Sequence, residues 1–288
     1  MLNRLCEGMH LVFDELHYIW ECKKTQHVVN ALLLIFFVVL LGLIELKRNS
    51  LLPAGLFPGL PTNPFYAVYL TFSLLLVVEV INLIFVVPAS VSRSVGKQLE
   101  ILILYFLRNA FKELIHFTEP IRLSGHMEPL LRIGAYGLGA LLIFICVSYY
   151  YRQQFKRQKS QAEGVRIFHF VGAKKAVGLI LLLLFLVLGV YNCVAIIRGF
   201  EGMDFFAEFF TILVFGDILL VLISHPFFPR FEDMFRNSGY AIATLLMRLS
   251  MTGPGYIDVV IGVGAALFAL LLAYVYRKNV QILSEVRG

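Results

Sequence analysis

Charged residues are scarce in this 288-residue chain, where they make up 15% of the sequence while hydrophobic residues make up 59%. An average globular protein carries roughly 25% charged residues. Several uncharged runs, such as "AVGLILLLLFLVLGVYNCVAII", are as long as the ~20 apolar residues that cross a hydrocarbon core. The composition excludes an ordinary soluble domain and predicts an all-α, polytopic membrane protein built as a helical bundle.

Cysteine and histidine are too few, and too dispersed, for metal or haem chemistry. The four cysteines form no CxxC pair, which favours small hydrophobic residues in a reduced compartment. None of the seven histidines lies deep in an apolar run, so the two inward-facing ligands of a membrane b-type haem are missing. We therefore expect no metal and no other cofactor.

Motifs of catalysis are missing as well. The sequence contains no HExxH, no GxSxG and no pair of catalytic carboxylates, which are signatures of hydrolytic sites. The "GPG" at 253–255 is typical of a tight turn. We expect that the protein is not an enzyme.

The first 27 residues form a segment of their own. Apolar residues recur at positions 2, 5, 9, 12, 13, 16, 19 and 20, which predicts one apolar face of a helix. Glu7, Asp14, Glu15 and Glu21 leave the polar face without the Lys/Arg excess of a helix drawn to anionic lipid. We expect an amphipathic helix packed on its own bundle or on a partner protein. Because the first apolar run starts only at Val28, no cleavable signal peptide is predicted.

Eight apolar segments are predicted to span the membrane. They are Val28–Leu46, Phe65–Val87, Gln98–Phe117, Ile133–Tyr151, Ala176–Ile197, Phe205–Ile223, Tyr240–Met251 and Ile257–Tyr276. The loop after the fourth segment holds seven basic residues and one acid, the mark of a cytoplasmic loop. An even number of spans then places both termini in the cytoplasm. Such loops account for the net charge of +6, so we expect no nucleic-acid partner.

An internal repeat divides the chain. "GLGALLIFICVSYYYR" (137–152) and "GVGAALFALLLAYVYR" (262–277) align without a gap and share seven of sixteen residues. Units of four spans keep the same orientation in the membrane. The predicted parts are an amphipathic helix (1–27), a four-helix unit (28–152), a basic linker (153–175), a second four-helix unit (176–279) and a tail (280–288). Small residues in the repeated helix, Gly137, Gly139, Gly262 and Gly264, are predicted to allow close helix packing.

Each predicted unit has an acid in its second span and an arginine inside its third. These residues are Glu79 and Arg108 in the first unit, and Asp217 and Arg248 in the second. An ionised group at the bilayer centre costs roughly 2.5–3.5 kcal/mol on insertion scales, so it needs a partner. Counting residues from the cytoplasmic ends matches the depths of acid and arginine within about 3 Å. We predict one buried ion pair in each unit.

Basic residues near the cytoplasmic ends of the third spans are possible further partners of these acids: Arg93, Lys97 and Arg236. Two roles stay open for the pairs. A buried pair can fix helix register, or it can conduct or sense ions. One deep arginine per unit does not match a voltage sensor, which carries several at three-residue spacing.

The second unit resembles a known family over residues 215–279. The similarity rests on the acid in the second helix, a basic residue twelve positions before the arginine, the arginine itself and a Pro–x–x–x–Asp turn; here these are Asp217, Arg236, Arg248, Pro254 and Asp258. The segment is similar to the four-helix phosphate-starvation-inducible E (PsiE) family. The resemblance implies a helical fold in a bacterial cytoplasmic (inner) membrane and says little about activity. The tandem departs from that single-unit family, and the first unit lacks the proline–aspartate turn.

These features favour a non-catalytic integral membrane protein that acts as a subunit, anchor or scaffold of a larger membrane complex. Its expected partners are membrane lipid and either other protein subunits or a second copy of the chain. The alternative is a channel or transporter for protons or another small ion, using the acid–arginine pairs.

Overall fold

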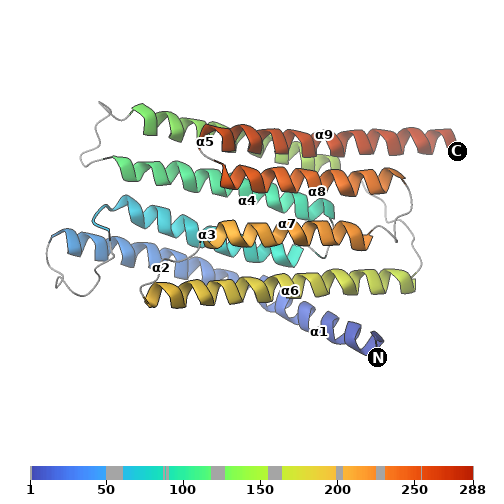
Figure 1. Cartoon of the computed structure of the whole chain (residues 1–288), viewed down its shortest axis with the longest axis horizontal. Helices are drawn as coiled ribbons and strands as arrows, with labels where there is room; N and C mark the ends of the chain where they lie inside the picture. The colour runs from blue at the N-terminus through green and yellow to red at the C-terminus, as the bar shows by residue number, and fades with distance from the viewer. Residues whose placement is uncertain are drawn as a thin grey trace.

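The computed structural model describes residues 2–49, 61–86, 88, 91–117, 127–154, 164–198, 204–224, 231–253 and 255–287. Within these residues the chain is helical and contains no strand (Figure 1). The helices are α1 (Leu2–Glu21), α2 (Lys23–Arg48), α3 (Phe65–Val86), α4 (Val91–Glu113) with a 3-10 turn η1 (Leu114–His116), α5 (Met127–Gln154), α6 (Gly164–Ile197), α7 (Phe205–Ser224), α8 (Phe231–Thr252) and α9 (Tyr256–Arg287).

Six of these helices are long and apolar enough to cross a membrane: α2, α3, α5, α6, α7 and α9. Their outward faces carry large exposed hydrophobic residues, for example Leu34 on α2, Leu183 on α6 and Leu271 on α9. A lipid bilayer is the solvent in which such surfaces are stable. The expectation of a helical, integral membrane protein is confirmed at this level.

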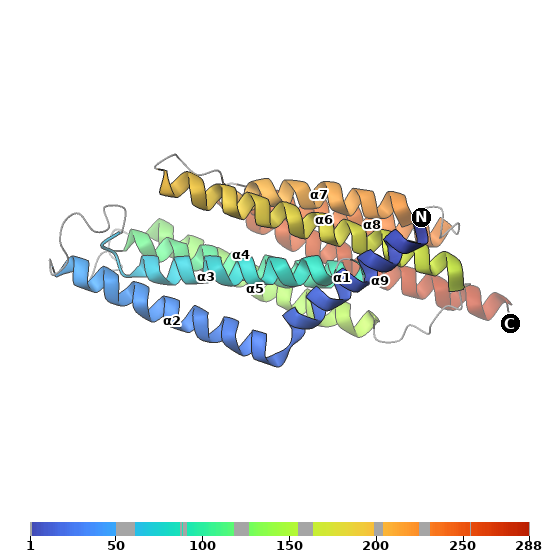
Figure 2. The same ribbon diagram turned by 90° about the horizontal axis from the view of Figure 1, so that it is seen from below.

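The helices form two rows that stack on each other. Within each row a helix packs on the next along the chain, α2–α3–α4–α5 in the first row and α6–α7–α8–α9 in the second. The rows meet through α5 with α9, α4 with α8 and α9, and α3 with α6. Figure 1 shows both rows running in the same order from bottom to top, and Figure 2 shows them from below. Each predicted four-helix unit is therefore an open row.

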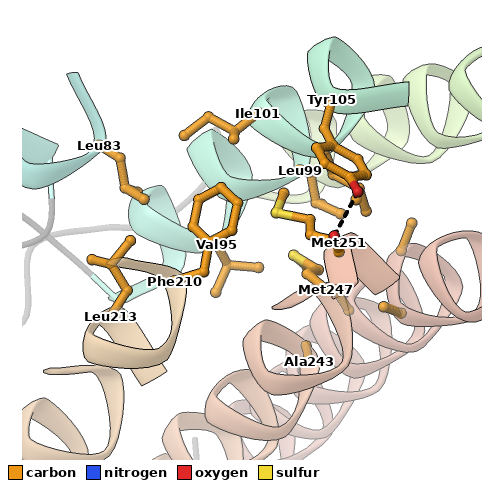
Figure 3. Close-up of a cluster of buried hydrophobic side chains, with 14 of the residues drawn as sticks. Leu83, Val95, Leu99, Ile101, Tyr105, Phe210, Leu213, Ala243, Met247 and Met251 are labelled. Carbon is orange, nitrogen blue, oxygen red and sulfur yellow. Dashed lines mark hydrogen bonds between the residues drawn. The ribbon is translucent and has the colours of Figure 1, made fainter. Parts of the chain in front are cut away.

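The main hydrophobic core lies between the rows. Side chains from α3, α4, α7 and α8 meet in it, as Figure 3 shows with Leu83, Leu99, Phe210 and Met247. The Tyr105 hydroxyl of α4 donates a hydrogen bond to the Met251 carbonyl of α8 at 2.5 Å, which ties the rows together. Because the core is shared, neither row would bury its apolar side chains alone.

Helices α4 and α8 are the two central helices and also the most polar of the rows. On α4 only Arg93 and Lys112 are exposed. One face of α8 is buried against α4, α7 and α9, while Ile242, Leu245 and Leu249 point outward. The arrangement packs Arg108 and Arg248 against neighbouring helices and leaves apolar residues on the outward face of α8, as a bilayer requires.

Both chain ends lie at the same end of the molecule. Figure 1 shows the start of α1 and the end of α9 there, together with the end of α5 and the start of α6. The end of α2 and the start of α3 are at the opposite end. The two rows thus run in the same direction along the long axis.

Helix α1 packs against its own bundle, on α6 and α2. Phe13 is 4% exposed and fits between the Phe85 ring of α3 and Gly178 of α6, where an added Cβ would lie 3.0 Å from the Phe13 ring. Lys175 binds the Asp14 carboxylate at 2.6 Å. The sequence predicted that this helix packs either on its own bundle or on a partner protein, and among the described residues it packs on its own bundle.

Candidate functional site

Asp217 and Arg248 face each other between α7 and α8. Arg248 is 5% exposed, and its Nη2 lies 3.8 Å from Oδ2 of Asp217. The distance is within ion-pair range but too long for a hydrogen bond. The guanidinium also lies over the ring of Phe210, 5.2 Å from its centroid. The structure brings the two residues together as a loose ion pair.

Several polar atoms beside this pair are buried without a hydrogen-bond partner. They are Nε and Nη2 of Arg248 and Oε1 of Gln98 on α4. Gln98 donates through Nε2 to both Asp217 oxygens at 3.4 Å and to Ser94 Oγ at 3.3 Å, all long hydrogen bonds. An unsatisfied buried polar group costs about 1–3 kcal/mol. Hydrogen bonds within the described residues therefore leave this pair incompletely satisfied.

A small cavity adjoins Asp217 where α4, α7 and α8 meet. The cavity has a volume of about 20 Å³, which is room for one water. Its polar lining comes from Ser94, Gln98, Asp217, Tyr240 and Thr244, and its apolar lining from Val91, Val95, Leu220, Val221 and Ala241. The site can hold a water against the Asp217 carboxylate, whose other neighbour is Arg248 at 3.8 Å.

The predicted ion pair between Glu79 and Arg108 in the first row is wrong. Glu79 binds Nζ of Lys97 at 2.6 Å and accepts a hydrogen bond from Asn82 at 3.2 Å. Lys97 also binds Glu100 at 3.0 Å. Asn82 accepts a hydrogen bond from the Trp20 indole, which connects this cluster to α1. Glu79, the acid of the first row, therefore forms its ion pair with Lys97 near the end of the bundle that holds the chain termini.

The error comes from the register of α3 and α4. The sequence count took Gln98 as the start of the third span, but α4 begins at Val91, directly after a short connection. Helices α3 and α4 consequently pack side by side starting from the end of α3 and the start of α4. Glu79 then lies at the same height as Lys97. Arg108 lies about 16 Å farther along α4 at 1.5 Å per residue.

The second row has a different register. Ser224, the last residue of α7, lies beside Asn237 of α8, with Asn237 Nδ2 3.4 Å from Ser224 Oγ. The first turns of α8 therefore extend past the end of α7. This offset carries Asp217 to the level of Arg248, whereas a similar acid-to-arginine spacing does not bring Glu79 to Arg108 in the first row.

Arg108 lies among aromatic rings. It is 8% exposed, and its guanidinium carbon is 5.6 Å from the Tyr69 ring centroid, 5.1 Å from that of Tyr105 and 5.1 Å from that of Phe206. Its Nε is buried without a hydrogen bond. Within the described part of the chain no carboxylate oxygen lies within 4 Å of this guanidinium.

The three basic residues predicted as end partners have three different surroundings. Lys97 holds Glu79 and Glu100, as described above. Arg93 is exposed to solvent. Arg236 is 7% exposed, lies 3.6 Å from the Asp233 carboxylate and 4.6 Å from the Tyr276 ring centroid, and donates to Asn237 Oδ1 at 3.1 Å.

Only two of the four predicted packing glycines are in close contact. A Cβ on Gly139 would lie 2.7 Å from Val259, and one on Gly262 would lie 2.6 Å from the Phe106 ring. Gly137 and Gly264 have open space around the same position, so their predicted role is wrong. Residues two apart lie about 200° apart around a helix, so one neighbouring helix cannot contact both members of a pair.

Gln98 and Asp258 make hydrogen bonds that the sequence did not predict. Gln98 continues a polar stripe on α4, with Ser94 one turn before it. Asp258, 1% exposed, accepts a hydrogen bond from the Tyr136 hydroxyl at 2.8 Å, and its carbonyl accepts one from Ser250 at 2.7 Å. Asp258 thereby joins α9 to α5 and α8. Pro254, predicted in the same turn, lies outside the described residues.

Among the described residues, no cluster of three or more His, Cys, Asp or Glu side chains is placed to hold a metal ion. Comparison with protein-family models, with curated proteins and with solved structures finds no match for this chain.

Proposed function

We propose that the chain is a non-catalytic integral membrane protein that serves as a subunit or anchor of a larger membrane complex. The supporting observation is the outer face of α1. Leu11, Val12, Leu16, Tyr18 and Ile19 are between 38% and 76% exposed there, although the inner face is packed on the bundle. An exposed apolar patch with a polar rim is typical of an interaction site.

The chemistry of this face favours a protein over a lipid surface. Glu7, Glu15 and Glu21 are exposed around the apolar residues. Acidic fringes repel the anionic headgroups that attract amphipathic helices to membranes. The partner that fits is an apolar helix or groove with lysine or arginine at its rim, located at the end of the bundle that holds both termini.

The membrane topology proposed with this role has eight spans. Helices α4 and α8 are 23 and 22 residues long, enough to cross the bilayer while shielded by their neighbours. The basic linker favours a cytoplasmic position for the end that holds the termini. A tandem origin from the PsiE family is part of the same proposal.

Site-specific photo-crosslinking in native membranes tests the subunit role. A photoreactive residue replaces Ile19 on α1 or, as control, Ile35 on the exposed face of α2. We expect Ile19 to give one crosslinked protein in stoichiometric yield and Ile35 to label lipid. A Val12→Lys change should remove the protein crosslink by repelling the basic rim. Lipid labelling alone from Ile19 would contradict the proposal.

A second candidate function is proton or small-ion transport, favoured by the cavity between α4, α7 and α8. The unsatisfied atoms of Gln98 and Arg248 beside Asp217 are those of a site that exchanges partners. Intramembrane ionisable groups commonly mark ion pathways. Flux of protons, sodium and potassium into proteoliposomes tests this candidate, with Asp217→Asn expected to abolish transport in a folded protein. Absence of flux for all three ions in the wild-type protein would eliminate it.

A further inference from the structure

Arg108 is a buried cation, and among the described residues no carboxylate oxygen lies within 4 Å of its guanidinium. The acid that the repeat assigns to it, Glu79, is bound to Lys97 instead. The equivalent arginine of the second row, Arg248, has Asp217 at 3.8 Å. One of two similar arginines is thus neutralised by the protein, and the other is surrounded by rings of Tyr69, Tyr105 and Phe206.

Aromatic rings do not satisfy the hydrogen-bond donors of the Arg108 guanidinium. A ring face attracts a cation electrostatically, but the guanidinium also carries five N–H donors in its own plane that need acceptor oxygens. The buried Nε of Arg108 has no acceptor among the residues that the structure describes. The remaining requirement is an acceptor with negative charge.

A second cation lies beside the first. Lys112, one turn farther along α4, is exposed, and its Nζ is 5.9 Å from the centroid of the same Tyr69 ring. Two acids of the described residues near this end have partners of their own. Glu113 lies 3.7 Å from Arg132 and 4.0 Å from His116, and Asp204 accepts from the Ala207 amide at 3.3 Å.

We propose that Arg108 and Lys112 bind a phosphate group between α3, α4 and α7, with Tyr69 and Phe206 flanking it. A planar guanidinium fork binds phosphate oxygens in pairs, and the lysine adds a point charge. Arg108 lies about 8 Å from the end of α4, close to the depth of lipid headgroups. The phosphodiester of an anionic lipid and a free phosphate ion share this chemistry. The inference is independent of the subunit role proposed above.

Thermal unfolding of the full-length protein in mild detergent tests the proposal and separates the two sources. One arm adds phosphatidylglycerol, with phosphatidylcholine as the matched lipid; the other adds inorganic phosphate, with chloride at equal ionic strength. We expect phosphatidylglycerol or phosphate to raise the Tm of the wild-type protein by about 3–6 °C. Arg108→Gln should lose the shift, Lys112→Gln should retain less than half, and Arg93→Gln, at an exposed position on the same helix, should retain all of it.

The outcome identifies or rejects the site. A shift with phosphatidylglycerol alone assigns a lipid headgroup, and a shift with phosphate alone assigns a soluble ion. An equal shift in the wild-type and Arg108→Gln proteins, or no shift in either arm, overturns the proposal. If Arg108→Gln does not accumulate, Arg108→Lys replaces it: this variant keeps the charge, lacks the fork and should lose at least half of the shift.

Discussion

Arg108 and Arg248 occupy matching positions in the two predicted repeats, yet their surroundings differ. Arg248 lies near a carboxylate and the unsatisfied Oε1 of Gln98, while Arg108 lies among aromatic rings. Helix α7 contacts both arginines, since the Phe206 ring faces Arg108 and the Phe210 ring, one turn later, faces Arg248. The register between neighbouring helices therefore decides which residues meet, even where acid and arginine recur at similar spacing.

The largest predicted contrast concerns the two acids. Asp217→Asn leaves Arg248 without a counter-charge in the core and should cost about 3–5 kcal/mol of stability. Glu79→Gln should cost about 1 kcal/mol, because Glu79 and Lys97 side chains are each about one fifth exposed. Unfolding in mixed detergent micelles measures both values. Equal losses would show that the two rows use their acids in the same way.

A smaller contrast is expected between the end arginines. Arg236→Gln removes contacts to Asp233, Asn237 and Tyr276 and should lower stability by about 1–3 kcal/mol. Arg93→Gln, at an exposed position, should leave the unfolding midpoint unchanged. The same micelle titration serves as the measurement. A loss for Arg93→Gln as large as that for Arg236→Gln would contradict the difference in burial.

The smallest contrast tests the glycines of the repeated helix. Gly262→Ala places a methyl group against Phe106 and the Ser250 hydroxyl and should cost about 1–2 kcal/mol. Gly264→Ala has free space and should stabilise α9 by up to about 0.5–1 kcal/mol through helix propensity. Thermal midpoints of the two variants should therefore move in opposite directions. A destabilised Gly264→Ala protein would place a neighbour there that the structure lacks.

Hydropathy and periodicity predict the helices well but not their contacts. Helices α4 and α8 form around the predicted spans despite Arg108 and Arg248, because the apolar residues around each arginine maintain the pattern, but they begin seven and nine residues earlier than predicted. The Glu79–Arg108 prediction failed because the start of α4 and the length of the preceding turn are not encoded in hydropathy. The partnership of Gln98 with Asp217 also escaped prediction, since it joins helices from different rows. A polar stripe at helical spacing, Ser94 with Gln98, was the only signal for it.

The attachment of α1 also fixes an order of events during synthesis. Asp14 and its partner Lys175 are separated by 161 positions in the chain. At about 5–20 residues per second, the ribosome makes Lys175 roughly 8 to 30 s after Asp14. Helix α1 therefore cannot reach its final place until the start of the second row has emerged. During that interval Phe13 and the rest of its apolar face are available to chaperones or to a partner subunit, so assembly with a partner could begin before the chain is complete.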